Sequence, residues 1–280
     1  RGALVKWNST VRVKYLKTST SPSVILGKNQ WLFYRPGVDD YRGLTSLTKD
    51  QLDDTSYSIQ NKRDWLRERG IYYLVVIVPN KETIYPEYLP EAATRVHQQT
   101  KLEQFLGYLQ ANWDMEVLDV RDSLLRAKAQ HPVYYRTDTH WNDYGAFVSY
   151  CEIMEELSAR FPSLQPPSIS EYDVVQDSAS YSGDLARMLA MPETFRESET
   201  PKVIVKPDWI SSRVKVGKAV VFRDSFFDTL EPYLSAHFED VVVAPMYGRF
   251  DPAFVEREQP DVVISICVER DFDVRLVGTV

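Results

Sequence analysis

Cysteine is scarce in this chain of 280 residues, which contains only Cys151 and Cys267. Two cysteines so far apart do not form the closely spaced pairs of a disulfide framework or a zinc site, which argues against both. Each lies in an apolar stretch, so we expect both to be buried as small hydrophobic side chains. The four histidines show no metal-ligand spacing either, and we expect no metal and no cofactor.

Long apolar runs are also missing. No stretch approaches the about 18 consecutive apolar residues of a membrane-spanning helix, so we expect no transmembrane segment within this chain. The start at Arg1 rather than Met is typical of a processed or trimmed form that lacks its signal or anchor.

Acidic residues are missing from the first 38 positions, which contain seven basic ones, whereas the remaining residues carry 26 basic and 40 acidic side chains. The net charge of −7 therefore combines a basic N-terminal region with an acidic body, which argues against a nucleic-acid partner. We interpret residues 1–24 as a basic arm that is solvated or touches a membrane surface or polyanion. Residues 25–280 then form a single domain.

Strands and helices alternate along most of that domain. The most distinct strand is Ile71 to Val78, a continuous β-branched and aromatic run typical of a parallel sheet covered on both faces. Alternation of this kind predicts an α/β fold, a three-layer sandwich with a mainly parallel sheet. Residues 163–213 are irregular and are interpreted as an insertion, in which Ser182 to Leu185 precede a short helix. Residues 27–34 are expected to form a turn that leads into an aromatic strand, which ends at Pro36 and Gly37. The other expected strands are 116–120, 203–205, 218–222, 240–244 and 261–268, and the expected helices are 48–69, 94–112, 121–129, 142–160, 227–238 and 252–258.

Two separated stretches contain the residue types of a hydrolase-like triad. In an extended segment, Asp138 and His140 point to the same side about 7 Å apart, within reach of a carboxylate–imidazole contact. Ser225 follows a buried strand and precedes a helix, at the kind of turn that displays nucleophilic serines at the carboxyl edge of a sheet. A serine needs a base, and the base needs a group that fixes its tautomer. The alternative is that Asp138 and His140 are a chance pair and that Ser225 is only a helix cap.

Four motifs occur in a fixed order: Gly27 to Tyr34 (GKNQWLFY), Val78 to Pro86 (VPNKETIYP), Asp138 to Asn142 (DTHWN) and Arg223 to Phe226 (RDSF). Over residues 25–275 the chain thereby resembles the alginate O-acetyltransferase family of the AlgJ and AlgX type. The resemblance implies an SGNH-hydrolase-like fold in permuted order, with Ser225 as nucleophile, His140 as base and Asp138 as its orienting carboxylate.

It also implies acetyl transfer to an exported polysaccharide outside the cytoplasm, in the periplasm or at the cell surface. The acetyl donor would be delivered by a membrane-bound O-acyltransferase partner. Two departures stand out. Arg223 occupies a position where a small residue or histidine is expected, and the chain has no room after Arg270 for the carbohydrate-binding module of AlgX-type members. It therefore looks closer to the single-domain AlgJ type.

Further candidate site residues lie on loops that follow predicted strands. Asn80 is a candidate second oxyanion donor beside the Ser225 backbone N–H. Lys81, Tyr247 and Arg249 are candidate substrate-binding residues, although each is equally compatible with an ordinary surface role. Trp141 is a candidate for stacking on a sugar ring, and packing against the loop is the favoured alternative.

Two other functions remain open at this point. An acetylesterase would use the same triad with water in place of the sugar hydroxyl. A non-catalytic polysaccharide-binding component of an export complex would carry the three residues without using them, and it belongs to a different functional class.

Overall fold

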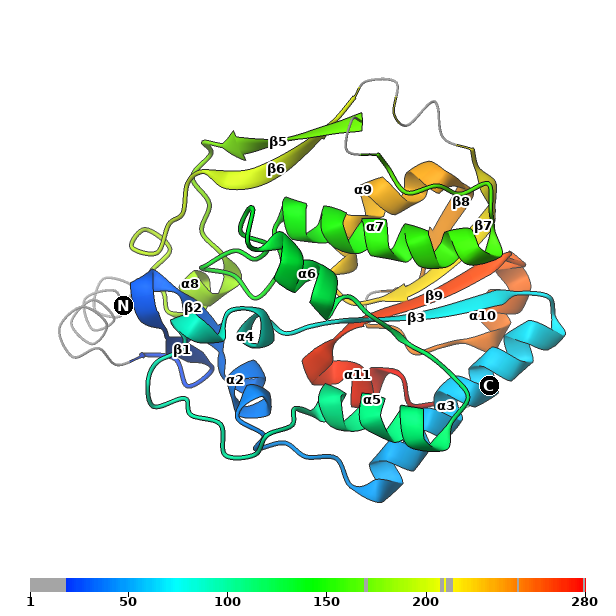
Figure 1. Ribbon diagram of the computed structural model, residues 1–280, viewed down its shortest axis with the longest axis horizontal. Helices are drawn as coiled ribbons and strands as arrows, with labels where there is room; N and C mark the ends of the chain where they lie inside the picture. Colours follow the sequence, from blue (N-terminus) through cyan, green and yellow to red (C-terminus); the bar gives the residue numbers. More distant parts are fainter. Residues whose placement is uncertain (1–18, 169–170, 207–208, 210–213, 246, 279) are drawn as a thin grey trace.

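The computed structural model describes residues 19–168, 171–206, 209, 214–245, 247–278 and 280. A five-stranded sheet runs through this part of the chain in the order β4-β3-β9-β7-β8, and every neighbouring pair is parallel (Figure 1). The strands are β3 (Tyr72–Val78), β4 (Leu118–Asp119), β7 (Val216–Arg223), β8 (Phe238–Val243) and β9 (Val262–Val268). The predicted parallel α/β sheet is therefore confirmed, with strand ends that differ by one or two residues.

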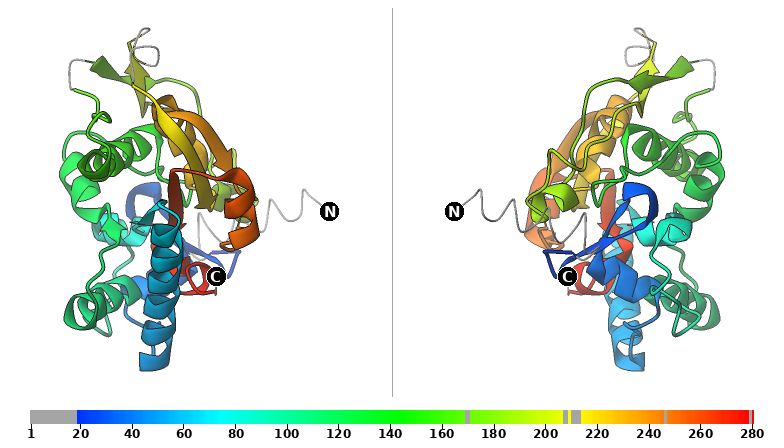
Figure 2. Two further views of the ribbon diagram at one scale, coloured as in Figure 1. Left: turned by 90° about the vertical axis from the view of Figure 1, so that its right-hand side faces the viewer. Right: turned by 90° about the vertical axis from the view of Figure 1, so that its left-hand side faces the viewer.

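Helices cover both faces of this sheet because alternate residues of its strands point to opposite sides. Val76 and Val78 of β3 pack with one helical layer, whereas Val75 and Ile77 pack with the other. The two layers lie on either side of the sheet, which makes the predicted three-layer sandwich (Figure 2). The first layer holds α4 (Lys81–Ile84), α6 (Arg121–Ala127), α7 (Asp143–Arg160) and α9 (Phe227–Leu234), and the second holds α3 (Lys49–Glu68), α5 (Lys101–Asn112), α10 (Pro252–Glu258) and α11 (Phe272–Arg275).

Side-chain caps fix where several helices begin. The Thr48 hydroxyl accepts the Gln51 N–H at the start of α3, and Asn142 caps α7 in the same way. The helix expected over 94–112 begins only at Lys101, because Thr100 and Glu103 form a capping box there. The prediction is therefore wrong for residues 94–100, which form bends and irregular structure. Short 3-10 turns occur at Lys28–Gln30, Pro86–Tyr88, Ser235–His237 and Glu269–Asp271.

The insertion contains more regular structure than its sequence indicates. An antiparallel ribbon joins β5 (Tyr172–Asp177) to β6 (Thr200–Val205), and α8 (Asp184–Met188) lies between them in the chain. Only β6 and the short helix were predicted. Strand β5 was missed because most of its residues are polar or exposed, so it shows no apolar run. Its Tyr172 ring nevertheless packs on Phe147 of α7, which ties the ribbon to the core.

A hairpin of β1 (Val24–Leu26) and β2 (Leu32–Tyr34) precedes helix α2 (Arg35–Tyr41). Its apolar side packs on α8 of the insertion, as Leu32 and Leu185 share one buried cluster. Of the basic arm expected over residues 1–24, positions 1–18 lie outside the described residues. Pro36 and Gly37, expected to end the strand, sit in the first turn of α2, where proline is tolerated.

Both cysteines are free, with Cys267 buried on β9 and Cys151 partly buried on α7. Across the described part of the chain, no helix combines the length and the apolar character needed to cross a bilayer.

Candidate active site

The carboxyl ends of three neighbouring strands bring the predicted loops together. Val78, the last residue of β3, pairs with Val268 at the end of β9, and Arg223 at the end of β7 pairs with Ile266. The residues that follow these ends therefore meet at one edge of the sheet. They are Asn80 and Lys81 after β3, Asp224 and Ser225 after β7, and Glu269 and Arg270 after β9.

Ser225, His140 and Asp138 form a continuous hydrogen-bonded line at this edge. His140 Nε2 lies 2.7 Å from Ser225 Oγ, and His140 Nδ1 lies 2.6 Å from Asp138 Oδ1. The Asp138 side chain is 3% exposed and the His140 side chain is 27% exposed. The carboxylate is thus sealed inside the protein, while the imidazole and the serine hydroxyl remain open to solvent. This is the geometry that a serine nucleophile and its base require.

The Asp138 carboxylate is held by more than its histidine. Its Oδ2 accepts the Tyr181 hydroxyl at 2.6 Å and the Asp184 N–H at 2.9 Å, and its Oδ1 also accepts the His140 N–H at 3.1 Å. Burial acts to raise the pKa of Asp138, but the bonds from His140, Tyr181 and Asp184 outweigh it and hold the pKa below its usual value. The carboxylate is therefore ionised and fixed in orientation.

Lys81 lies under the Asp138–His140 loop. It is 1% exposed, and its Nζ donates to the carbonyl oxygens of Tyr135 (3.3 Å), Arg136 (3.3 Å) and Asp138 (2.5 Å). Burial lowers the pKa of this ammonium to about 8. Its donors are directed at the loop backbone, so these contacts favour a positioning role over the substrate-binding role expected from the sequence.

The insertion holds the same loop from another side. Glu197, which is 4% exposed, accepts the Arg136 N–H at 2.9 Å, the Thr137 N–H at 3.0 Å and the Thr137 hydroxyl at 2.6 Å. Asp184 accepts the Thr139 N–H at 2.8 Å and the Thr139 hydroxyl at 2.6 Å. The loop that carries Asp138 and His140 is thus held by two acidic side chains of the insertion, the buried Glu197 and the half-buried Asp184.

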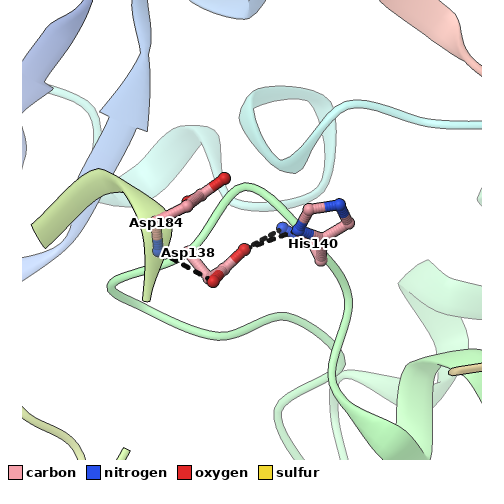
Figure 3. Close-up of side chains that lie close together, drawn as sticks. All are labelled: Asp138, His140 and Asp184. Carbon is pink, nitrogen blue, oxygen red and sulfur yellow. Dashed lines mark hydrogen bonds and ion pairs between the residues drawn. The ribbon is translucent and has the colours of Figure 1, made fainter. Parts of the chain in front are cut away.

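One group of side chains is close enough together to be considered as a metal site. It consists of Asp138, His140 and Asp184, and one potential ligand atom of each lies within 4.8 Å of the others. Figure 3 shows Asp138 lying between the other two side chains, bonded to both residues. The carboxylate oxygens of Asp138 and Asp184 accept N–H and O–H groups of the protein. This arrangement favours a hydrogen-bonded support for His140 over a metal centre.

Asp224 fixes the turn that carries the nucleophile. It is 2% exposed, and its two oxygens accept the Phe226 N–H at 2.9 Å and the Val268 N–H at 2.8 Å. Burial raises the pKa of Asp224. The Asp224 carboxylate therefore bonds both the turn that contains Ser225 and the end of β9. These bonds fix the position of the Ser225 hydroxyl relative to the sheet.

Trp141 packs behind the catalytic loop. The side chain is fully buried, and its Nε1 donates to the Phe226 carbonyl oxygen at 3.1 Å. Because no face of the indole is accessible, this geometry favours the packing alternative over stacking on a sugar ring.

The remaining candidates differ in accessibility. Asn80 is fully buried and donates through Nδ2 to Asp40 at 3.3 Å, which directs its amide away from an oxyanion role. Tyr247 is 50% exposed, and its hydroxyl lies 3.4 Å from Ser225 Oγ. Arg249 is exposed two residues further along the same loop. Of these residues Tyr247 is the one whose side chain reaches the nucleophile.

Sequence reasoning missed four residues that support the loop, namely Thr139, Tyr181, Asp184 and Glu197. Asp184 carries a partial signal, because the sequence predicts a short helix after Ser182 to Leu185, and α8 begins at Asp184 itself. Tyr181 and Glu197 lie in irregular sequence without a motif. In the sequence, nothing distinguishes Glu197, which is buried in the structure, from the many exposed acidic residues of the chain.

A cavity of about 560 Å³ lies elsewhere, beside the amino end of β3. Its lining includes Arg63, Tyr72 and Arg160, and it contains none of the three triad residues. The chemistry suggested by the triad therefore belongs to the opposite, carboxyl edge of the sheet.

Residues 24–233 match the sequence profile of a family described as "ALGX: SGNH hydrolase-like domain, acetyltransferase AlgX". Curated relatives include two proteins named "Probable alginate O-acetylase AlgJ". That of Pseudomonas syringae pv. tomato is 29% identical over 194 residues, covering 69% of this chain and 46% of the relative. That of Azotobacter vinelandii is 29% identical over 216 residues, covering 75% of this chain and 52% of the relative. The chain thus spans about half the length of the curated relatives it matches.

Solved structures share the fold. The O-acetyltransferase domain of Pseudomonas putida AlgJ superposes with a TM-score of 0.59 at 23% identity, covering 90% of this chain and 93% of that one. Bacillus cereus PatB1 superposes with a TM-score of 0.65 at 13% identity, covering 92% of this chain and 99% of that one.

Proposed function

The chain belongs to the AlgX-type family of SGNH hydrolase-like acetyltransferases, and we propose that it moves an acetyl group through Ser225 onto hydroxyls of an exported polysaccharide. The observation that carries this proposal is the hydrogen-bonded line from Ser225 through His140 to Asp138, with distances of 2.7 and 2.6 Å. Such a line activates a hydroxyl for attack on an acyl carbon without a cofactor.

In the first half of the reaction, Ser225 Oγ attacks the carbonyl carbon of an activated acetyl ester. His140 Nε2 takes the serine proton as the new C–O bond forms. The resulting imidazolium is stabilised by the Asp138 carboxylate, which is buried and ionised. When the tetrahedral intermediate collapses, the leaving group departs with the proton held on Nε2, and acetyl-serine remains.

In the second half, a sugar hydroxyl takes the place of the leaving group. His140 Nε2 accepts its proton while its oxygen attacks the acetyl-serine carbon. Collapse breaks the ester bond to Ser225 and returns the proton to Oγ, so the enzyme is regenerated and the sugar is acetylated. One imidazole serves both halves because Nδ1 stays bonded to Asp138 throughout.

Both tetrahedral intermediates need donors for their negative oxygen. The Ser225 backbone N–H is the first donor we assign, since it belongs to the same turn as Oγ. For the second we assign the Tyr247 hydroxyl in place of Asn80, because this hydroxyl lies 3.4 Å from Ser225 Oγ while the Asn80 amide donates to Asp40.

The acceptor we propose is alginate or another exported polysaccharide, since the relatives are named alginate O-acetylases. Arginine side chains on segments that follow the carboxyl ends of β8 and β9 suit an acidic polymer despite the net charge of −7. Arg249 is exposed, and the Arg270 guanidinium lies 5.8 Å from the Phe226 ring centroid, next to the nucleophile. A neutral glycan is compatible with the same site.

We further propose that residues 25–280 act as one acetyltransferase domain, because residues from Trp31 to Val268 share one buried cluster. A membrane-bound O-acyltransferase would supply the acetyl group. The reaction would take place outside the cytoplasm, in the periplasm or at the cell surface, where the polymer is exported.

An acetylesterase is the alternative enzyme, because water can replace the sugar in the second half without any change in the triad. A non-catalytic polysaccharide-binding component is the other alternative. The buried support around Asp138 argues against it, since a binding surface needs no ionised carboxylate behind a histidine.

The test is intact-mass spectrometry after incubation with a small activated acetyl ester, followed by a soluble oligosaccharide of alginate. We expect the protein to gain the mass of one acetyl group, to lose it when the sugar is added, and to yield acetylated sugar. Ser225→Ala should gain nothing.

Release of free acetate without any sugar product would identify the esterase instead. A folded protein that gains no mass and turns over no ester would rule out the covalent mechanism and leave the binding component.

A further inference from the structure

The sheet is incomplete beside the amino half of β3. β4 pairs with β3 only at Val76 and Ile77, and it is the outermost strand on that side. Within the described part of the chain, residues 72–75 of β3 therefore have no strand beyond them at this edge. The cavity of about 560 Å³ lies here, lined by residues 70–75 on one side and on the other by residues 114–118, which lead into β4. The cavity thus occupies the place where an amino half of β4 would run.

Main-chain groups of β3 point toward this cavity. The Tyr72 N–H donates to the Asp261 carbonyl oxygen at 2.9 Å, on the β9 side of the strand. The N–H groups of a strand alternate between its two edges, so those of Tyr73 and Val75 point to the other side, toward the cavity. Neither has a hydrogen-bond acceptor among the described residues. Because Val75 is 4% exposed, an unpaired N–H at this position favours an occupant that supplies a carbonyl oxygen.

Both helical layers contribute walls to the cavity. Arg63 and Arg67 come from α3 on one face of the sheet, and Glu156 and Arg160 come from α7 on the other face. Figure 1 shows β3 running between these two helices. The cavity therefore lies in the plane of the sheet, which is where a bound peptide lies when it extends a sheet by one strand. At about 3.3 Å rise per residue, residues 72–75 offer an edge about 13 Å long, which matches a short extended peptide.

Two of the arginines lack a charged partner. Arg67 pairs with Asp64 at 2.7 Å, whereas Arg63 and Arg160 form no ion pair with any acid that the structure describes. Both lie near the Tyr72 hydroxyl, since burial raises the pKa of Tyr72 to about 12 while the charges of Arg63 and Arg160 act in the opposite direction. Two unpaired guanidinium groups beside one strand edge favour an occupant with negatively charged groups.

Three acids line the same cavity and limit what can bind. Glu156 accepts the Tyr72 hydroxyl at 3.0 Å, which takes up part of its hydrogen-bonding capacity. Asp114 and Glu116 are exposed on the segment opposite β3, which would lie along the outer edge of an added strand. These acids disfavour an occupant that is negative along its whole length, such as a polyuronate. They favour one whose acidic side chains are directed at the helices.

We propose that this cavity binds an extended peptide segment of another protein, which adds to the edge of β3 and carries two adjacent acidic residues. Successive side chains of a strand point to opposite faces of the sheet. One acid then meets Arg63 of α3, and the next meets Arg160 of α7. The peptide main chain supplies carbonyl oxygens to the Tyr73 and Val75 N–H groups. The site is independent of the proposed acetyl transfer, because Ser225 lies at the carboxyl ends of the strands.

Binding of a short peptide tests the proposal directly. The probe is a dye-labelled hexapeptide with blocked ends, of sequence Thr-Val-Glu-Glu-Val-Thr, and fluorescence anisotropy with the whole chain measures its dissociation constant. We expect saturable binding, and we expect Arg63→Glu and Arg160→Glu each to raise the dissociation constant at least about tenfold. Both arginines are exposed on their helices, so these variants should fold.

Two altered peptides distinguish strand addition from a general attraction between charges. In Thr-Glu-Val-Glu-Val-Thr the two acids point to the same face of a strand, so we expect this peptide to bind about tenfold more weakly at the same net charge. A peptide of the first sequence with N-methylated glutamates cannot pair as a strand, and we expect its binding to be lost. Equal binding of all three peptides would refute strand addition.

Hydrogen–deuterium exchange locates the bound peptide. We expect the Tyr73 and Val75 amides to exchange at least about tenfold more slowly when the first peptide is bound, because each N–H then has an acceptor. Arg196→Glu is the matched control, since this arginine is 43% exposed and pairs with Glu193 on the surface of the insertion. It should leave peptide binding unchanged.

Three outcomes would overturn the proposal. They are the absence of saturable binding of the first peptide, binding that survives both substitutions at Arg63 and Arg160, and unchanged exchange of the Tyr73 and Val75 amides. Displacement of the peptide by an equal concentration of free glutamate, or of a soluble uronate oligosaccharide, would likewise overturn it and identify the cavity as a small-molecule or sugar site.

Discussion

The Tyr181 hydroxyl donates to Asp138 Oδ2 at 2.6 Å, while the other oxygen of the same carboxylate faces His140 Nδ1 at 2.6 Å. Tyr181 comes from the insertion, and Asp138 comes from the loop that follows α6. A residue outside the five-stranded sheet therefore orients the carboxylate that contacts His140, the proposed base. The insertion is part of the site's support rather than a peripheral cap.

We expect Tyr181→Phe to slow acetylation of Ser225 about tenfold while the fold is retained. Removal of the hydroxyl takes one charge-assisted hydrogen bond from Asp138, which weakens its hold on the imidazole by about 1.5 kcal/mol. The measurement is the rate of acetyl-enzyme formation with an aryl acetate. Tyr135→Phe is the control, because the Tyr135 ring stacks on Tyr181 at 4.2 Å. Equal rates in the two variants would contradict a positioning role for Tyr181.

Gly183 allows the insertion to approach the catalytic loop. A Cβ at this position would lie 2.4 Å from the Thr137 carbonyl oxygen and 2.5 Å from the Asp138 backbone N. We expect Gly183→Ala to push the two segments apart and to reduce acetyl-enzyme formation more than tenfold. Gly107→Ala is the control, since its Cβ would meet no atom within 4 Å and alanine stabilises a helix by roughly 0.5 to 1 kcal/mol. If Gly183→Ala forms the acetyl-enzyme at the wild-type rate, the close contact between the insertion and the loop of Asp138 is unimportant for the reaction.

The central sheet and the three triad residues could be predicted because their signals are local. Strand β3 is a continuous apolar run, and the Ser225 turn directly follows another such run. The order of four short motifs then linked Asp138 and His140 to this distant serine. Each apolar run and each motif is short and is recognised without knowledge of the contacts that it makes in the fold.

The support of the site could not be predicted, because it depends on side-chain direction and on long-range contacts. Asn80 and Lys81 follow β3 at the carboxyl edge as expected, although Lys81 begins α4 rather than lying on a loop. The sequence does not tell whether a side chain at this edge points into the protein or toward solvent. Glu197 is 60 residues away from its partner Thr137 in the chain. No periodic pattern reports such a contact.

Lys81 is predicted to be a structural lysine. Lys81→Met leaves buried carbonyl oxygens of Tyr135, Arg136 and Asp138 without their donor, so we expect the free energy of unfolding to fall by roughly 3 kcal/mol. Denaturant titration measures this change. Lys202→Met, on the exposed side of β6, should cost far less. A small loss of stability in Lys81→Met, together with a raised KM for the sugar, would favour the substrate-binding role for Lys81.

A buried carboxylate near the site is predicted to make stability depend on pH. Asp40 is 1% exposed and accepts hydrogen bonds from the Thr45 hydroxyl, the Lys101 N–H and Asn80 Nδ2. Burial, followed by the charge of Glu269, raises the pKa of Asp40 to about 6. Between about pH 4 and pH 6 the folded protein therefore binds more protons at this group than the unfolded chain does.

It follows that this group's contribution to stability is lost as the pH rises through that window. We expect the stability of the wild type relative to Asp40→Asn to fall by at most about 3 kcal/mol from pH 4 to pH 7. Urea titrations at several pH values measure this difference. Asp54→Asn, an exposed change on α3, should leave the wild-type pH profile in place. If stability depends on pH in the same way for Asp40→Asn and the wild type, Asp40 does not titrate in this range.

Tyr247 provides the sharpest test of the proposed oxyanion site. Its backbone has a φ of 62°, in the left-handed region that a tyrosine adopts at a cost of about 1 to 3 kcal/mol. The Arg275 guanidinium packs 4.3 Å from its ring centroid, and its hydroxyl lies 3.4 Å from Ser225 Oγ. Strain that is retained beside a nucleophile suggests that the position of this hydroxyl matters for the reaction.

If Tyr247 stabilises the oxyanion, Tyr247→Phe should lower kcat about 100-fold with little change in KM, as expected for an interaction made only in the transition state. Steady-state kinetics with an aryl acetate, and then with an oligosaccharide acceptor, measure both constants. Tyr57→Phe is the control, because Tyr57 is a 58% exposed tyrosine on α3. A raised KM for the oligosaccharide at unchanged kcat would instead assign Tyr247 to acceptor binding, and the second oxyanion donor would then have to be sought on the backbone.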